Sequence, residues 1–202
     1  MILSEHYYSE NPQSKSSPKT WDYRLRGHLF SFTSDLGVFS KNEVDFGSRL
    51  LIEKFEEPAV SGDILDLGCG YGPIGLSLAK SYPDRRVTMA DVNDRALILA
   101  KENAKQNNID NVEILKSDGF SNLGGRRFAA VVTNPPIRAG KKVYYPWFDK
   151  AQEALLEGGE LWAVIQKKQG APSLKTKLME VFGNAEIAAR DKGYYVFLAR
   201  KV

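Results

Sequence analysis

The sequence predicts an α/β fold with a mostly parallel sheet of about seven strands and helices on both faces. From residue 62 onward, short apolar runs alternate with stretches in which apolar residues recur at helical spacing. Such an alternation requires crossover connections, which produce parallel strands. The last two apolar runs flank Lys192-Gly193, which predicts a closing hairpin that adds an antiparallel strand. A chain of 202 residues, 43% of them hydrophobic, can bury one core of this size.

The N-terminal part of the chain has a different pattern. The first 20 residues are rich in Ser and Lys, so we expect a polar, poorly ordered arm there. Residues 21–202 are expected to form a single domain. Its first part, about residues 21–45, alternates apolar and polar side chains and predicts a β extension with a hairpin over 23–33. Asp45 is expected to start a helix.

The elements after Gly62 follow from periodicity and from residues that interrupt it. Pro83 ends the first helical stretch, and Leu97, Ala100 and Ala104 share one face of the second. We expect helices over residues 74–81, 95–107, 148–156 and 174–182. We expect strands over residues 64–67, 86–90, 112–115, 129–132, 160–165, 186–189 and 194–199.

Composition sets broad limits on location and partners. The net charge of +3 allows a nucleic acid partner without requiring one. The single cysteine, Cys69, cannot form an internal disulfide, which favours a reducing compartment. No apolar run reaches the roughly 18–20 residues that a membrane span needs, and the N-terminus lacks a signal-peptide pattern. We therefore expect a cytoplasmic protein with no membrane partner.

The first informative motif is a glycine loop directly after the first strand of the regular region, Asp66-Leu67-Gly68-Cys69-Gly70-Tyr71-Gly72. Glycines allow positive φ and a close backbone approach to a ligand. A pyrophosphate loop reads G-x-G-x-x-G, but here the third glycine comes one residue early. An acidic residue before the loop would repel pyrophosphate and suits an ammonium group. The loop thus indicates S-adenosylmethionine, with a purely structural turn as the alternative, and Cys69 reads as a small tucked side chain.

Polar residues end four neighbouring strands of the predicted sheet, and ligands of open α/β sheets bind at that edge. These residues are Asp66, Asp91, Asp118 and Asn134. Asp91 stands about 20 residues after the glycine loop, where an acidic side chain accepts both hydroxyls of a ribose. Asp118 is also expected to contact the ligand, with a turn former before Gly119 as the alternative. Together the four predict a nucleoside-containing ligand.

The second informative motif follows a strand at Asn134-Pro135-Pro136-Ile137. Two prolines remove two backbone donors and stiffen the turn, which leaves the carbonyls of Asn134 and Pro135 free to face a pocket. An exocyclic NH₂ carries two donors, so a side-chain oxygen and a backbone carbonyl can hold both hydrogens. The nitrogen lone pair can then point at an electrophilic carbon. A rigid loop without this chemistry is the alternative.

At these two motifs the chain resembles the class I S-adenosylmethionine-dependent methyltransferases that methylate nitrogen, which implies a Rossmann-like fold. More narrowly, Gly37-Val38-Phe39-Ser40, Asp45-Phe46-Gly47 and the stretch from Asn134 to Lys141 are similar to the RsmC-like ribosomal RNA guanine-N2 methyltransferases. The resemblance covers about residues 22–202. It implies methyl transfer to the N2 amine of a guanine in ribosomal RNA, with the small subunit (16S rRNA) expected.

The resemblance also implies a set of site residues and no metal. The catalytic tetrad would be Asn134, Pro135, Pro136 and Ile137. S-adenosylmethionine, leaving as S-adenosylhomocysteine, would contact Asp66, Gly68, Cys69, Gly70, Asp91, Val92, Asp118, Gly119, Phe120, Phe39 and Ser40. Apart from the resemblance, the cations Arg138, Lys141 and Lys142 flank the tetrad and Arg24 and Arg26 precede the fold, so we expect these residues to contact RNA, with a solvated loop as the alternative.

The tetrad departs from the family at its fourth position, which is usually an aromatic residue that stacks on the target base. Ile137 has no π face, so stacking would come from elsewhere, with Phe39, Tyr144 or Trp147 as candidates. The partner would be ribosomal RNA or an assembled small subunit, and the protein a monomer or a homodimer.

Two other functions remain open at this point. The same tetrad suits a glutamine side-chain amide of a protein, and a catalytically silent domain of this fold could simply bind RNA. A dehydrogenase fits least, because the glycine spacing is wrong for a dinucleotide and the tetrad would be unexplained.

Overall fold

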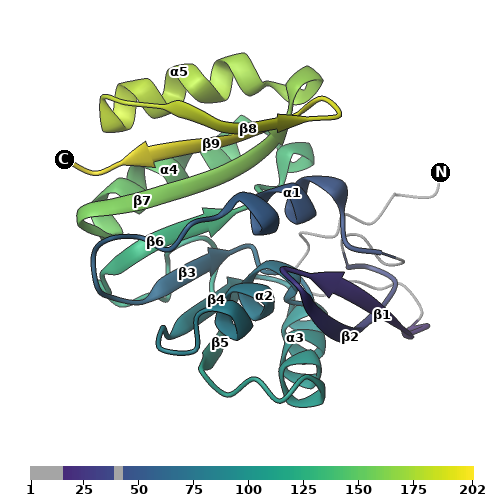
Figure 1. Ribbon diagram of the computed structural model, residues 1–202. Coiled ribbons are helices and arrows are strands. Elements are labelled where there is room, and N and C mark those ends of the chain that lie inside the picture. The colour runs from purple at the N-terminus through teal and green to yellow at the C-terminus, as the bar shows by residue number, and fades with distance from the viewer. Residues whose placement is uncertain (1–15, 39–42) are drawn as a thin grey trace.

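The computed structural model describes residues 16–38 and 43–202 (Figure 1). Its centre is a seven-stranded sheet with the strand order β5-β4-β3-β6-β7-β9-β8. The strands are β3 (Ile64–Leu67), β4 (Val87–Asp91), β5 (Val112–Lys116), β6 (Phe128–Thr133), β7 (Leu155–Gln166), β8 (Glu186–Asp191) and β9 (Tyr194–Arg200). Strands β3 to β7 are parallel, and β9 runs antiparallel between β7 and β8. This confirms the predicted sheet and its closing hairpin.

Helices cover both faces of the sheet (Figure 1). They are α1 (Phe46–Lys54), α2 (Pro73–Ser81) and α3 (Asp94–Gln106) on one face, and α4 (Lys141–Ala154) and α5 (Ala171–Phe182) on the other. Strand β7 shows how one sequence serves both layers. Trp162 and Val164 pack toward the first face, and Leu161, Ala163 and Ile165 toward the second, because successive side chains of a strand point to opposite sides.

The strand order reverses at β3, which pairs with β4 on one side and with β6 on the other. The chain runs outward from β3 through β4 to β5 and then returns to β6. Connections on the two sides of such a reversal diverge at the carboxyl ends of the strands, which opens a crevice there. The glycine loop follows β3 and the Asn134 tetrad follows β6, so the two motifs face each other across this crevice.

A two-stranded sheet of β1 (Lys19–Leu25) and β2 (His28–Ser34) precedes the main fold, as predicted. The side-chain amide of Asn103 on α3 donates to the Thr33 carbonyl and accepts from the Thr33 N–H, so α3 holds the edge of β2. Strand β1 begins at Lys19, and Ser16 Oγ donates to Asp35 at 2.7 Å. The expected arm over residues 1–20 was therefore too long, and residues 1–15 lie outside the described part of the chain.

The start of α4 was also predicted wrongly. The helix begins at Lys141, seven residues before the expected 148, and Pro146 lies inside it. A proline within a helix removes the N–H that would reach the carbonyl of residue 142. Lys142 is exposed, so water can satisfy that carbonyl. The helix ends at Ala154, and the next residue already belongs to β7, which starts five residues earlier than expected.

Candidate active site

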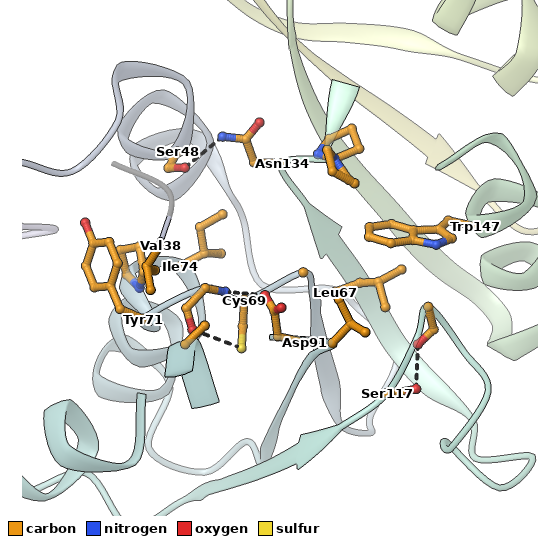
Figure 2. A pocket seen from close by; sticks show the side chains of 18 of the residues that line it. Val38, Ser48, Leu67, Cys69, Tyr71, Ile74, Asp91, Ser117, Asn134 and Trp147 are labelled. Carbon is orange, nitrogen blue, oxygen red and sulfur yellow. Dashed lines mark hydrogen bonds between the residues drawn. The ribbon is translucent and has the colours of Figure 1, made fainter. Parts of the chain in front are cut away.

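A pocket opens at the carboxyl ends of β3, β4 and β6, between the glycine loop and the tetrad (Figure 2). In Figure 2, Asn134 and Ser48 lie on one side of it, Asp91 across from them, and Trp147 on a third side. The lining residues include Leu67, Gly68, Cys69, Gly70, Asp91, Val92, Asp118, Gly119, Asn134, Pro135 and Pro136. Eleven residues from four separated stretches of sequence thus meet at one site.

The glycine loop turns β3 into α2 with three glycines at positive φ, Gly68, Gly70 and Gly72. Gly70 has φ 57° and a Cβ there would meet open space, which leaves the backbone accessible from the pocket. Gly72 has φ 101°, and a Cβ would come within 2.9 Å of Leu76 and Met89. Pro73 takes the first helical position, where its missing N–H costs little. The predicted close-approach loop is present.

Asp91 ends β4 and organises the loop beneath the pocket. One carboxylate oxygen accepts from the N–H of Gly70 at 2.8 Å, and the other from the N–H of Asn93 at 2.9 Å. Burial raises the pKa of this carboxyl, and the backbone donors oppose that rise. Each oxygen keeps a further lone pair, and the side chain lines the pocket, so Asp91 can still accept from a pair of ligand hydroxyls.

Asp66 lies deeper than the sequence suggested. Its side chain is fully buried, and one oxygen accepts from the N–H of Gly75 at 2.7 Å in the first turn of α2. The other oxygen has no hydrogen-bond partner in the described chain. Burial raises the pKa of this carboxyl to about 7, with the nearby charge of Asp91 adding to the effect. Asp66 does not line the pocket, and its second oxygen is an unpaired acceptor beneath the loop.

Three further predicted cofactor contacts lie at the end of β5, with different placements. Asp118 is exposed on the pocket rim. Gly119 is buried with φ 54°, and a Cβ would stand 2.7 Å from Nε1 of Trp147, so the indole packs directly on its backbone. Phe120 packs against the apolar cluster under α4 rather than lining the pocket. Phe39 and Ser40, the remaining predicted contacts, lie outside the described residues.

Cys69 is 4% exposed, and its thiol makes a 3.5 Å contact with the Gly70 carbonyl. Burial raises the pKa of the thiol well above its ordinary value, and the neighbouring carboxylates raise it further. Since the thiolate is the reactive form, this cysteine is a tucked structural side chain, as its position between two glycines suggested.

The tetrad begins where β6 ends, and its Asn134 side chain is held by α1. Nδ2 of Asn134 donates to Oδ2 of Asp45 at 3.1 Å and to Oγ of Ser48 at 3.0 Å (Figure 2). Both amide hydrogens are therefore used, and Oδ1 remains as the free acceptor. The carbonyl of Pro135, expected to be free, accepts from the N–H of Ile137 at 2.8 Å and so keeps one lone pair.

Sequence reasoning missed the partners of Asn134. Asp45 was identified as a helix start, and it does cap α1, since Oδ2 accepts from the N–H of Ser48 at 3.1 Å. No local signal tells that the same oxygen reaches a residue 89 positions away. The available signal was the Asp45-Phe46-Gly47 motif. Helix capping accounts for Asp45 but gives no reason for a glycine at position 47.

The candidates for base stacking are now distinguishable. Tyr144 is 1% exposed inside the cluster beneath α4 and does not line the pocket. Trp147, one helical turn later, lines the pocket and lies 3.4 Å from where a Cβ of Gly68 would be. Ile137 packs at the edge of the same cluster. Of the candidates that lie in the described residues, Trp147 is the one that lines the pocket.

The predicted cations fall into two groups. Arg138, Lys141 and Lys142 are exposed directly after the tetrad, in η1 (Ile137–Ala139) and the first turn of α4. Arg26 donates to the carbonyls of Ile52 and Phe55 at the far end of α1, each at 2.8 Å. It holds the C-terminus of that helix, and Arg24 lies in the same hairpin, so the structure does not bring these two to the tetrad.

Among residues 16–38 and 43–202, no group of three His, Cys, Asp or Glu side chains is arranged to hold a metal ion. Within the same residues, no helix has the length and apolarity to cross a bilayer.

Comparison with known proteins shows similarity over nearly the whole chain. The family model described as the methyltransferase small domain matches residues 30–198. A Bacillus subtilis protein, uncharacterized protein YbxB, is 60% identical over 99% of this chain and 100% of its own length. The ribosomal RNA small subunit methyltransferase C of Pasteurella multocida is 34% identical over 90% of this chain.

The fold is shared with a solved structure. The T. thermophilus 16S rRNA N2 methyltransferase RsmC, in complex with AdoMet and guanosine, superposes with a TM-score of 0.82 at 28% identity over 95% of this chain. The chain spans 55% of the Pasteurella relative and 52% of the solved RsmC chain, about half the length of each.

Proposed function

Because the chain belongs to the methyltransferase small domain family, we propose that it transfers a methyl group from S-adenosylmethionine (AdoMet) to the N2 amine of a guanine in ribosomal RNA. The observation that carries the proposal is the side chain of Asn134. Its amide lies at the rim of a nucleoside-sized pocket with both hydrogens engaged by α1 and its oxygen free. A fixed acceptor at that place suits an exocyclic amine.

The residues around the pocket fit AdoMet, which supplies an activated methyl group on its sulfonium. Asp91 would accept from the ribose hydroxyls, and the open backbone at Gly70 allows close approach of the methionine end. Asp118 on the rim would accept from the adenine amine. Asp66 lies beneath the loop and does not line the pocket, so an ionised Asp66 would favour the ammonium group by its charge and not by direct contact.

The tetrad would bind and polarise the amine. Oδ1 of Asn134 accepts one hydrogen, and the remaining lone pair of the Pro135 carbonyl accepts the other. Positive charge builds on the amine nitrogen during transfer, so both acceptors stabilise the transition state more than the ground state. Positioning contributes the rest of the effect, and the methylated amine can lose its proton to water.

Ribosomal RNA is favoured as the substrate by the relatives and by charge. The Pasteurella and T. thermophilus proteins carry names that state methylation of small-subunit RNA. Arg138, Lys141 and Lys142 are exposed beside the tetrad, where phosphates bordering a flipped guanine would lie. We extend the proposal to 16S RNA on this basis. Glutamine of a protein is the alternative substrate.

The experiment is incubation of the protein with labelled AdoMet and either ribosomal subunits or translation factors. Label in RNA supports the proposal, and label in protein alone would support the glutamine alternative. Asn134→Ala should abolish RNA labelling while leaving the dissociation constant for AdoMet within about twofold. Asn122→Ala is the matched control, because that exposed side chain donates to a backbone carbonyl of β5 away from the tetrad. Labelling by Asn134→Ala at the wild-type rate would refute the role of the tetrad.

A further inference from the structure

The motif Asp45-Phe46-Gly47-Ser48 does more than start a helix. Oδ2 of Asp45 caps α1 and also accepts from Asn134, and Ser48 offers its hydroxyl oxygen to the same amide. Gly47 permits the close packing behind them, since a Cβ would stand 2.9 Å from the ring of Tyr194 and 3.0 Å from Oδ2 of Asp45. Through these hydrogen bonds the motif holds the N-terminus of α1 next to Asn134, the residue that follows β6.

This contact fixes which way the Asn134 amide points. A carboxylate can accept hydrogen bonds and cannot donate them, so only the NH₂ end of the amide can face Asp45. The flipped amide would place two oxygens against each other. Asp45 therefore keeps Oδ1 of Asn134 available to a substrate.

Asp45 also has an oxygen to spare. Its Oδ1 has no hydrogen-bond partner in the described residues, and the side chain lines the pocket beside Asn134. Each of these two pocket-lining side chains thus has one oxygen without a hydrogen-bond partner in the described residues: Oδ1 of Asn134 and Oδ1 of Asp45. The 3.1 Å hydrogen bond between the two side chains holds them together.

We propose that Asp45 selects guanine, by accepting the N1–H of the base while Asn134 accepts from the adjacent N2 amine. The inference rests on the proposed function and names the group that sets its base specificity. Guanine carries two donors side by side, N1–H and N2–H₂, which match two neighbouring acceptors. Adenine carries an acceptor at N1 beside its amine, and a glutamine amide carries a carbonyl beside its NH₂. Either acceptor would face the Asp45 carboxylate, leaving a repulsive, unpaired contact.

Two substitutions separate this role from helix capping. Asn and Ser are both good N-cap residues, so Asp45→Asn and Asp45→Ser should keep the helix and the thermal midpoint close to wild type. Asn can place its oxygen where Oδ2 stands and its NH₂ where the free oxygen stands, which turns the acceptor into a donor. Ser is too short to reach Asn134 and removes both contacts. Asp94→Asn is the matched control, since it removes the same charge at the start of α3, where the half-buried Asp94 pairs with Lys116 away from the tetrad.

The test measures binding of two nucleosides to protein saturated with S-adenosylhomocysteine. Guanosine has N1–H, and 2-aminopurine riboside has the same 2-amino group with an unprotonated N1. We expect wild type and Asp94→Asn to bind guanosine at least tenfold more tightly than 2-aminopurine riboside. Asp45→Ser should reduce this ratio to below about threefold, and Asp45→Asn should reverse it.

A ratio in both Asp45 variants equal to that of wild type would overturn the inference. A failure of the proposed function looks different, because wild type saturated with S-adenosylhomocysteine would then bind neither nucleoside, as a protein-glutamine methyltransferase would. The positioning role has its own readout in Ser48→Ala, which loses one acceptor of the Asn134 amide. With ribosomal RNA as substrate, this variant should lower kcat about tenfold with KM for AdoMet unchanged. An unchanged kcat would contradict the positioning role.

Discussion

Replacement of Asp66 by Asn should make the protein more resistant to alkaline conditions than wild type. In the folded protein, burial raises the pKa of Asp66 from 3.8 to about 7. Between these two values the folded state holds a proton that the unfolded state has lost, so wild-type stability falls as the pH rises through this window. Well above pH 7 Asp66 is ionised in both the folded and the unfolded state, so its contribution to the pH dependence of stability ends there.

The magnitude follows from the size of the pKa change. A rise from 3.8 to about 7 corresponds to about 4 kcal/mol of unfolding free energy, at about 1.4 kcal/mol for each pH unit. More than half of this, roughly 3 kcal/mol, is lost between pH 5 and pH 8. The amide introduced by Asp66→Asn is neutral throughout, so the stability of this variant relative to wild type should increase by that amount over the same range.

The assay is urea unfolding of the cofactor-free protein at pH 5, 6, 7 and 8, with Asp110→Asn as the same substitution at an exposed carboxylate. A stability difference between Asp66→Asn and wild type that stays constant within about 0.5 kcal/mol would refute the reasoning. Saturating AdoMet should shrink the pH dependence of wild type, because a positive charge bound in the pocket above the loop favours the ionised carboxylate.

Three other substitutions test the site. Asp91→Ala should weaken AdoMet binding in calorimetry by roughly 1–3 kcal/mol, the range for lost hydrogen bonds to a charged group, and unchanged affinity would exclude its ribose role. Gly119→Ala should weaken AdoMet binding about tenfold, because the new Cβ collides with the indole that covers this backbone, whereas Gly124→Ala has the same positive φ with open space around it and should bind normally. Arg138→Glu should weaken RNA binding and flatten its salt dependence, and Arg24→Glu should leave both unchanged; equal effects would mean that the tetrad flank is not the RNA surface.

The centre of the main sheet was predictable because β3, β4 and β6 are short apolar runs, each of which ends in or is followed by a polar or turn residue. Burial on both faces removes the need for alternation, and the crossover helices show a clear period. The start of α4 was not predictable by the same logic. A proline usually limits a helix, and the exposure of Lys142, whose carbonyl loses its helical partner, makes Pro146 tolerable there.

In the site, too, the features that are local in the sequence were predictable and the contacts between distant residues were not. The glycine loop, Asp91 and the tetrad are recognisable because each is a local pattern at a strand end. The hydrogen bonds from Asn134 to Asp45 and Ser48 join residues 89 and 86 positions apart, which no periodicity encodes. Tyr144 and Trp147 both lie in α4, and of the two only Trp147 lines the pocket. Their orientations could not be assigned from the sequence because the helix was expected to begin at residue 148, after both residues.

Nucleoside mass spectrometry of ribosomal RNA tests the central proposal most directly. RNA from cells that lack the protein would be compared with the same RNA after incubation with purified protein and AdoMet, with Asn134→Ala as the inactive counterpart. The account predicts that N2-methylguanosine is low in the first sample and restored in the second, in small-subunit RNA. An unchanged level of N2-methylguanosine, with transferred methyl found in protein or nowhere, would contradict it.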